Sequence, residues 1–212
     1  ILNHTEQFIQ KIENTPINIS TWRKQKSIYK NQDMYTNLEI GFAAFYLNRC
    51  NFSGVIKGGP IGGINQTGKW KIDARFNKED LIRRIRKIAE FKEYIKLYNK
   101  DTIELLEENE KTFKKCLLYL DPPYFRKGNQ LYTNHYKSRD HARIANCVSK
   151  LKGKWIVSYD NVPEIVDLYQ FVKKDRIRQF NISYSASEGR NKKGREIMFF
   201  APKSIIPECA IC

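Results

Sequence analysis

Residues 116–124 read Cys-Leu-Leu-Tyr-Leu-Asp-Pro-Pro-Tyr, an apolar run that ends in an acidic and aromatic turn. The run predicts a buried strand, and open α/β sheets bind ligands just beyond the carboxyl ends of their strands. Pro122 and Pro123 have fixed φ angles and no N–H group, so the turn presents its carbonyl oxygens and the Asp121 carboxylate as acceptors. Two such acceptors suit the two N–H donors of an adenine amino group, and Tyr124 offers a face on which a base can stack. Taken alone, the four residues are also compatible with a plain turn after a buried strand.

Segments of alternating type surround this strand. The sequence predicts helices over 102–114, 138–151 and 163–169, and strands over 94–98, 116–120 and 155–158. Alternation of this kind predicts a parallel sheet in an α/β fold. Two further strands, over 176–183 and 196–200, have no helix between them and are predicted to close the sheet as an antiparallel hairpin.

The N-terminal half of the chain has a different pattern. Apolar residues at helical spacing predict a helix over 5–15, which Pro16 ends. A second amphipathic helix is predicted to begin after Asn77, and its basic face suits either solvent or a phosphate backbone. Residues 51–68 hold six of the eleven glycines and predict a long irregular loop, which is either functional or a mobile surface insertion.

The composition is that of a folded, strongly basic protein. Lys and Arg number 38 against 23 Asp and Glu, which gives a net charge of +15, and 41% of the 212 residues are hydrophobic. The charge favours a polyanionic partner such as nucleic acid, although a protein that is merely basic has the same composition. The length suits one domain with a subdomain. No apolar run approaches the ~18 residues that a membrane span needs, so no membrane partner is expected.

The five cysteines are odd in number and scattered, which favours a reducing cytoplasm over a disulfide framework. Cys209 and Cys212 have the spacing of zinc ligands, but no second pair and no His lies near them. We therefore expect no metal.

The motif at 116–124 and four other segments resemble the adenine-specific DNA methyltransferases related to the Dam methylase, whose fourth motif is an apolar strand ending in Asp-Pro-Pro-Tyr. The similarity extends over nearly all of the chain. The matching segments are 45–54 (with Phe-Tyr-Leu-Asn-Arg and Phe-Ser-Gly), 59–78, 116–124, 155–160 (Trp-Ile-Val-Ser-Tyr-Asp) and 195–200 (Arg-Glu-Ile-Met-Phe-Phe).

The resemblance implies a cytoplasmic enzyme of bacterial or phage origin that transfers a methyl group from S-adenosyl-L-methionine to the exocyclic amino group of adenine in double-stranded DNA. The target base would first swing out of the duplex. Asp121 and Pro122 are implied to hold the amino group, Pro123 belongs to the same motif, and Tyr124 is implied to stack on the base. Asp101 is implied to lie beside the adenine ring of the cofactor, and Asp121 against the methyl donor.

The resemblance also implies a division of the chain into three parts. Residues 1–16 would be a remnant of the N-terminal part of the methyltransferase core, 17–93 a helical and irregular target-recognition insert, and 94–212 the catalytic core. The implied DNA contacts are Asn48, Arg49, Lys57, Lys69, Trp70, Lys71, Arg75 and Arg126.

One part of the family pattern is not found in this sequence. The Gly-rich cofactor loop of the family follows the first strand, whereas residues 58–63 follow no predicted strand and precede no predicted helix. We therefore expect a Rossmann-like sheet that lacks its N-terminal strand and loop, completed by an N-terminal segment or another chain. A non-catalytic DNA-binding fragment and an amino-methyltransferase acting on cytosine or RNA are the alternatives.

Overall fold

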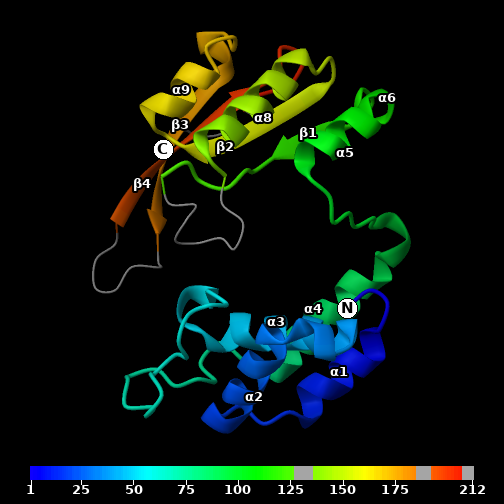
Figure 1. The fold of residues 1–212 in the computed structure, drawn as a ribbon, viewed down its shortest axis with the longest axis vertical. Coiled ribbons are helices and arrows are strands. Elements are labelled where there is room, and N and C mark those ends of the chain that lie inside the picture. Colours follow the sequence, from blue (N-terminus) through cyan, green and yellow to red (C-terminus); the bar gives the residue numbers. More distant parts are fainter. Residues whose placement is uncertain (127–135, 185–191, 207–212) are drawn as a thin grey trace. The chain divides into compact units, whose positions relative to one another are not determined.

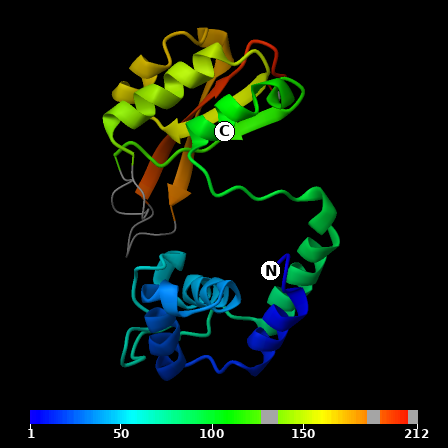
Figure 2. The same cartoon turned by 45° about the vertical axis from the view of Figure 1, so that its right-hand side comes forward.

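The computed structural model of the protein describes residues 1–126, 136–184 and 192–206. The chain forms two compact units, Ile1–Leu97 and Tyr98–Cys212. The first unit is helical and irregular, and the second contains the sheet (Figure 1, Figure 2).

Four helices and an irregular loop build the first unit. The helices are α1 (Thr5–Asn14), α2 (Ile19–Lys30), α3 (Asn37–Cys50) and α4 (Lys78–Glu90), with short 3-10 turns η1 (Gln32–Met34), η2 (Phe52–Gly54) and η3 (Lys92–Tyr94). Their apolar residues form one core, in which Phe8 and Ile12 of α1 are buried together with Phe42 and Tyr46 of α3. The helices predicted over 5–15 and after Asn77 are confirmed, and residues 1–16 pack within this helical unit.

Short polar side chains set where these helices begin. Asn18 accepts a hydrogen bond from the backbone N–H of Thr21 at the start of α2, and Asn77 caps α4 in the same way. Thr36 and Glu39 form a reciprocal capping box at the start of α3. These bonds satisfy amide groups that a helix leaves free at its first turn.

A four-stranded mixed sheet forms the centre of the second unit. The strands are β1 (Leu117–Leu120), β2 (Lys154–Asp160), β3 (Ile177–Tyr184) and β4 (Lys192–Phe200), in the order β1-β2-β4-β3. The helical elements of this unit are α5 (Thr102–Glu108), α6 (Glu110–Phe113), α8 (Ser138–Lys150), α9 (Pro163–Leu168) and the turn η4 (Lys174–Arg176). β1 pairs with β2 in parallel, and the predicted antiparallel hairpin of the last two strands is confirmed.

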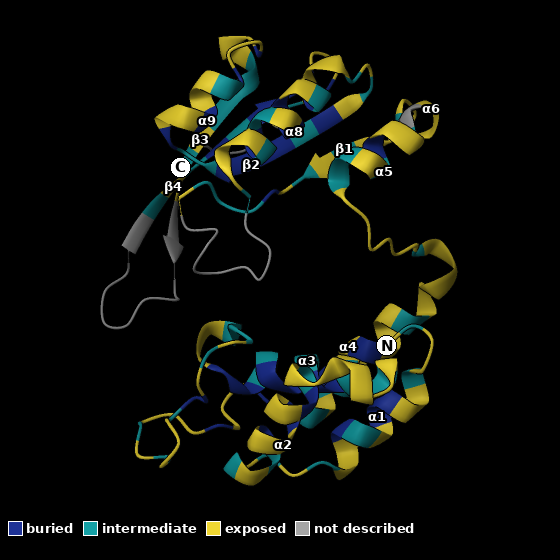
Figure 3. Cartoon of the chain, viewed as in Figure 1, coloured by how far each residue is buried: buried dark blue, intermediate teal, exposed yellow. Residues whose placement is uncertain are grey.

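One face of this sheet is covered by α8 and α9 (Figure 1). Val157 and Tyr159 of β2 point to that face and are buried against apolar side chains of the two helices. Neighbouring residues of a strand point to opposite faces, so Ser158 and Asp160 project from the other face. Ser158 is buried as well and Asp160 is half-buried, and Figure 3 shows a largely buried β2 beside helices whose outer surfaces are exposed.

The strand predicted over 94–98 is wrong. This segment contains the end of η3 and an extended stretch without strand pairing, in which Tyr94 is 86% and Leu97 is 81% exposed. An apolar, β-prone run becomes a strand only when another strand pairs with it, and no described strand does so here. The single helix predicted over 102–114 is divided at Asn109 into α5 and α6.

No helix in the described part of the chain is long and apolar enough to cross a bilayer.

His141 of α8 is buried under the sheet, with only 1% of its surface exposed. Its Nδ1 atom lies 3.0 Å from the hydroxyl oxygen of Tyr159, and its ring packs against Phe125. Desolvation by burial lowers the pKa of His141, although the negative charges of Asp160 and Asp140 act in the opposite direction. The fold therefore favours the neutral imidazole.

We expect His141 to make the protein less stable in mild acid. Its folded pKa lies below the ordinary value of 6.5, so the unfolded chain takes up this proton at a higher pH than the folded chain. The contribution of the neutral His141 to the free energy of unfolding is fully present above about pH 6.5 and is lost as the pH falls towards the folded pKa. Urea unfolding across this range should show a smaller loss for His141→Gln than for the native protein. The exposed His4→Gln variant should follow the native protein, and parallel profiles for all three would contradict the prediction.

Candidate active site

The turn that follows β1 places the Asp121 carboxylate at the carboxyl end of the strand. Asp121 Oδ1 accepts a hydrogen bond of 2.7 Å from the Ser158 hydroxyl of β2. Ser158 Oγ lies 3.0 Å from the hydroxyl of Tyr119, and because the Ser158 hydrogen is used on Asp121, Tyr119 is the donor in that contact. This chain of hydroxyl groups fixes the orientation of the carboxylate, while Asp121 itself remains exposed.

Pro122 and Pro123 continue the turn without a backbone N–H donor. Pro122 is buried and Pro123 is half-buried. The half-buried Tyr124 donates its hydroxyl hydrogen to Glu196 Oε1 of β4 over 2.6 Å. The tyrosine ring is therefore held at its hydroxyl end by the sheet.

The end of the turn is tied to β2 through its backbone. The amide groups of Phe125 and Arg126 donate to the two oxygens of Asp160, over 2.8 and 3.3 Å. The guanidinium of Arg126 lies 3.3 Å from the carboxylate of Glu164 on α9, and both side chains are largely exposed.

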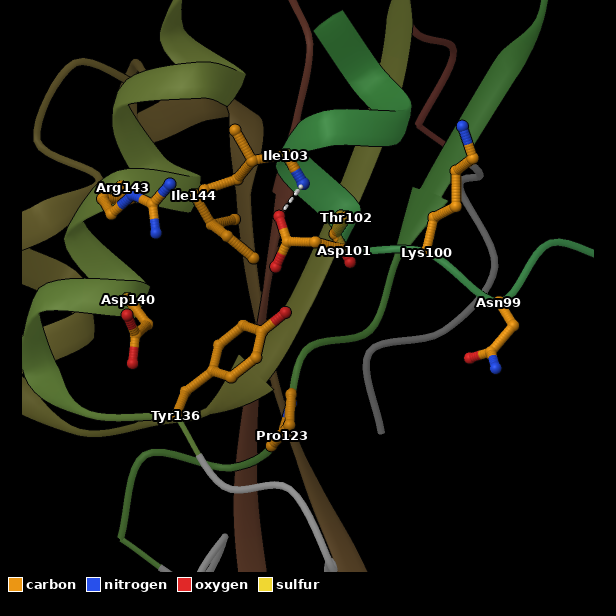
Figure 4. A pocket seen from close by; sticks show the side chains of 10 residues that line it. All are labelled: Asn99, Lys100, Asp101, Thr102, Ile103, Pro123, Tyr136, Asp140, Arg143 and Ile144. Carbon is orange, nitrogen blue, oxygen red and sulfur yellow. Dashed lines mark hydrogen bonds between the residues drawn. The ribbon is translucent and has the colours of Figure 1, made fainter. Parts of the chain in front are cut away.

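A pocket of about 640 Å³ opens beside this turn (Figure 4). Its lining residues are Asn99, Lys100, Asp101, Thr102, Ile103, Pro123, Tyr136, Asp140, Arg143 and Ile144. Asp101 Oδ1 caps α5 by accepting from the amides of Ile103 and Glu104, and among the described residues nothing bonds to the other oxygen. The structure thus brings two of the predicted site residues, Asp101 and Pro123, to the wall of one pocket.

A family model for the D12 class N6 adenine-specific DNA methyltransferases matches residues 1–185. The chain belongs to this family. It therefore has the S-adenosylmethionine-dependent methyltransferase fold, and its reaction is methyl transfer from that donor to the N6 amino group of adenine in DNA. No curated protein matches the chain.

The pocket of this methyltransferase fits the adenosine part of the methyl donor. Ile103 and Ile144 provide apolar surface, and Figure 4 shows the ring of Tyr136 facing the same hollow as the Asp101 carboxylate. A flat purine suits such walls, and its amino group suits the carboxylate oxygen of Asp101 that makes no cap. The volume is within the range of small-molecule sites.

The predicted DNA-binding residues other than Arg126 lie in the first unit, around the glycine-rich loop. Two buried or half-buried amides hold this loop together. Asn51 accepts from the indole N–H of Trp22 over 2.6 Å and donates to the carbonyls of Val55 and Ile56. Gln66 donates to the carbonyl of Ile61 over 2.8 Å and accepts from the backbone amide of Ile72 over 2.9 Å.

Arg49 and Arg75 both reach the start of this loop, where Arg75 donates to the carbonyl of Asn51. Burial lowers the pKa of Arg49, and the positive charges of Arg75 and Arg84 act in the same direction. Arg49 donates to the side-chain oxygen of Asn48, whose amide in turn donates to the carbonyl of Gly54. The structure therefore brings Asn48, Arg49 and Arg75 together.

The remaining predicted contacts are on the exposed outer part of the loop. Lys69 lies over the ring of Trp70, which is 66% exposed, and Lys71 donates to the carbonyl of Gln66. Lys57 is exposed. On the basic face of α4, Arg83 and Arg84 form ion pairs with Asp80 and keep most of their surface in solvent.

Within the described ranges, no group of three or more His, Cys, Asp or Glu residues is placed to hold a metal ion. Cys209 and Cys212, whose spacing was considered for zinc, lie outside the described residues.

Three residues that contact the turn were not predicted as site residues: Ser158, Asp160 and Glu196. Ser158 and Asp160 belong to the segment 155–160, and Glu196 belongs to 195–200, both of which were quoted as family matches. Ser158 and Asp160 could have been recognised from their spacing, because polar residues two apart at the carboxyl end of a strand share one face.

Proposed function

We propose that this methyltransferase holds its target adenine in the turn formed by Asp121, Pro122, Pro123 and Tyr124. The observation that carries the proposal is the fixed orientation of Asp121, which is bonded by Ser158 yet exposed at the end of β1. In the proposed complex the amino group of adenine donates one hydrogen to the Asp121 carboxylate and the other to the carbonyl of Pro122. The two bonds leave the nitrogen lone pair directed away from the turn.

The turn then acts mainly by positioning. S-adenosylmethionine supplies an electrophilic methyl group on a sulfonium sulfur. Asp121 and Pro122 would hold the amino nitrogen for displacement at that methyl group, in which the N–C bond forms as the C–S bond breaks and the sulfur keeps the electron pair. The proton that the methylated nitrogen then loses would leave along its hydrogen bond to the Asp121 carboxylate and pass to solvent. Neither a metal nor a covalent enzyme intermediate is required for a displacement of this kind. Asp101 would bind the adenine of the donor in the adjacent pocket.

The target base must leave the duplex before it reaches the turn. Swinging a base out costs a few kcal/mol of stacking and pairing, and contacts with the protein must offset this cost. We propose that the Tyr124 ring replaces part of the lost stacking.

The proposed duplex-binding surface belongs to residues 17–93, with Arg126 as a contact from the catalytic core at 94–212. Its basic and aromatic side chains are Asn48, Arg49, Lys57, Lys69, Trp70, Lys71 and Arg75. The cluster of Arg49 and Arg75 supports the proposal, because converging positive charges suit a phosphate.

The free thiols of Cys50, Cys116 and Cys147 are compatible with the reducing cytoplasm that we propose for the enzyme.

We also propose that a further segment, or another chain, pairs with β1 and supplies the contacts to the methionine part of the donor. β1 is an edge strand of the described sheet, and its Leu117 and Tyr119 side chains are 60% and 54% exposed. Edge strands are usually protected by charges or a cover, and this one carries apolar side chains instead. Residues 1–16 would be a remnant of the N-terminal part of the methyltransferase core, although they pack within the helical first unit.

We expect Asp121→Ala to reduce methyl transfer to below about a tenth of the native rate, a barrier increase above ~1.4 kcal/mol. The variant should keep duplex affinity within a few-fold, because phosphate contacts provide most of that affinity. Incorporation of labelled methyl groups and a DNA titration measure the two properties. Asp167→Ala on α9 removes an exposed carboxylate from the same unit and should have native activity. Native turnover in Asp121→Ala would rule out the proposed clamp.

Duplex affinity should fall steeply with salt. The slope of log K against log salt is about −0.9 per phosphate contact, so replacing Lys57, Lys69 and Lys71 by Gln should reduce its magnitude by roughly 2 to 3. Fluorescence anisotropy over a salt series measures the slope.

The matched control removes the same charge from the second unit, with Lys150, Lys152 and Lys154 replaced by Gln. This control should change the magnitude of the slope by less than about 0.9, the value of one phosphate contact. Equal changes in both triple variants would indicate that net charge, rather than the loop, determines binding.

The 212 residues by themselves should bind S-adenosylmethionine weakly, with a Kd above roughly 1 mM, or less than ~4.1 kcal/mol of binding free energy. The reason is that, in the proposed complex, the pocket takes the adenosine part of the donor, while the further segment would supply the contacts to the methionine part. Calorimetry measures the affinity, and Asp101→Ala should abolish the weak binding that the 212 residues retain. A micromolar Kd for these residues alone would show that no completing segment is needed.

A further inference from the structure

Asp160 and Glu196 lie directly opposite each other on neighbouring strands. They are register partners in the antiparallel pairing of β2 with β4, so both carboxylates project from the same face of the sheet. Like charges at opposed positions destabilise a sheet unless other groups compensate them. Both residues are half-buried, which increases the need for partners.

The compensation comes from three consecutive residues of the turn. Tyr124 donates its hydroxyl hydrogen to Glu196 over 2.6 Å, and Phe125 and Arg126 donate their backbone amides to Asp160 over 2.8 and 3.3 Å. Hydrogen bonds to a charged acceptor are shorter and about twice as strong as neutral ones. The carboxylate pair and the turn therefore stabilise each other.

These bonds constrain different parts of the turn. The two bonds to Asp160 fix the backbone just after Tyr124. The bond to Glu196 fixes the hydroxyl end of the tyrosine ring. Because a phenolic O–H prefers to lie in the plane of its ring, the direction of this bond also favours one rotation of the ring about its long axis. A stacking surface works best when its plane is set before the base arrives, because no ordering is then required on binding.

We propose that Asp160 and Glu196 are positioning residues for methyl transfer, in which Asp160 sets the backbone of the turn and Glu196 sets the plane of Tyr124 for the flipped adenine. The proposal rests on the proposed role of the turn as the adenine site. Neither carboxylate touches the reacting atoms; each acts through a residue of the turn.

The test compares Glu196→Ala, Glu196→Gln and Tyr124→Phe in the active methyltransferase. Glu196→Ala and Tyr124→Phe each remove the same hydrogen bond, so each should lower kcat roughly tenfold to a hundredfold. KM for DNA should stay within a few-fold, since phosphate contacts are unchanged. Glu196→Gln keeps an oxygen that accepts from the hydroxyl and should restore most of kcat.

A spectroscopic readout reports the stacking itself. The probe is a duplex with 2-aminopurine at the target adenine, whose fluorescence rises when the base leaves the helix and falls when it stacks on an aromatic ring. Glu196→Ala and Tyr124→Phe should both give a brighter complex than the native protein. The double variant should be no worse than either single variant, because both remove one interaction.

Three further variants distinguish a failure of the proposed adenine site from a failure of the positioning proposal. Asp167→Asn, an exposed carboxylate on α9, should behave as native in every assay. Tyr124→Ala removes the whole ring, and native activity in this variant would overturn both the adenine site and the positioning proposal. Loss of activity in Tyr124→Ala with native kcat and fluorescence in Glu196→Ala and Tyr124→Phe would overturn the positioning proposal alone. Asp160→Asn, checked for folding by thermal unfolding, should lower kcat without changing KM for DNA.

Discussion

The parallel pairing of β1 with β2 is the constraint on which the site depends. In this register Leu120 lies opposite Val157, so the next residues along the two strands are Asp121 and Ser158, which form the 2.7 Å hydrogen bond. A shift of one residue would turn Ser158 away from the site and bring a large buried side chain, Tyr159 or Val157, to its place. The buried face of β2 therefore specifies the register that the carboxylate requires.

Alternation along β2 also directs core residues to one face of the sheet and residues that contact the turn to the other. Val157 and Tyr159 pack under α8 and α9, where Tyr159 contacts the buried His141. Ser158 and Asp160 point to the other face and hold the two ends of the turn through Asp121 and the amides of residues 125 and 126. Phe125 joins the two sides, because its amide bonds Asp160 while its ring packs on His141. A single strand thus couples the core to the position of the turn.

The strands and the two covering helices of the second unit could be predicted because their apolar periodicity is strong and their patterns are short and uninterrupted. The segment 94–98 has the same composition but no described partner strand, which periodicity cannot reveal. Helix α2 was not predicted because its buried Trp22 and Ile28 are separated by a basic stretch, although Asn18 caps it. The Asp-Pro-Pro-Tyr turn was found from local chemistry. Its link to Glu196 spans 72 residues and depends on the pairing of β2 with β4, which no local pattern encodes.

The glycine-rich loop shows how irregular backbone can still be well defined. Gly62 has a φ of +82°, and a Cβ added there would lie 2.6 Å from the carbonyl oxygen of Trp70, so the residue is required by close packing of the backbone. The amides of Asn51 and Gln66 tie the surrounding carbonyl groups together. A loop ordered in this way loses less entropy on binding than a mobile insertion would. Lys57 and Trp70 are thereby presented on a preformed frame, which favours the functional interpretation of the glycine cluster over that of a mobile surface insertion.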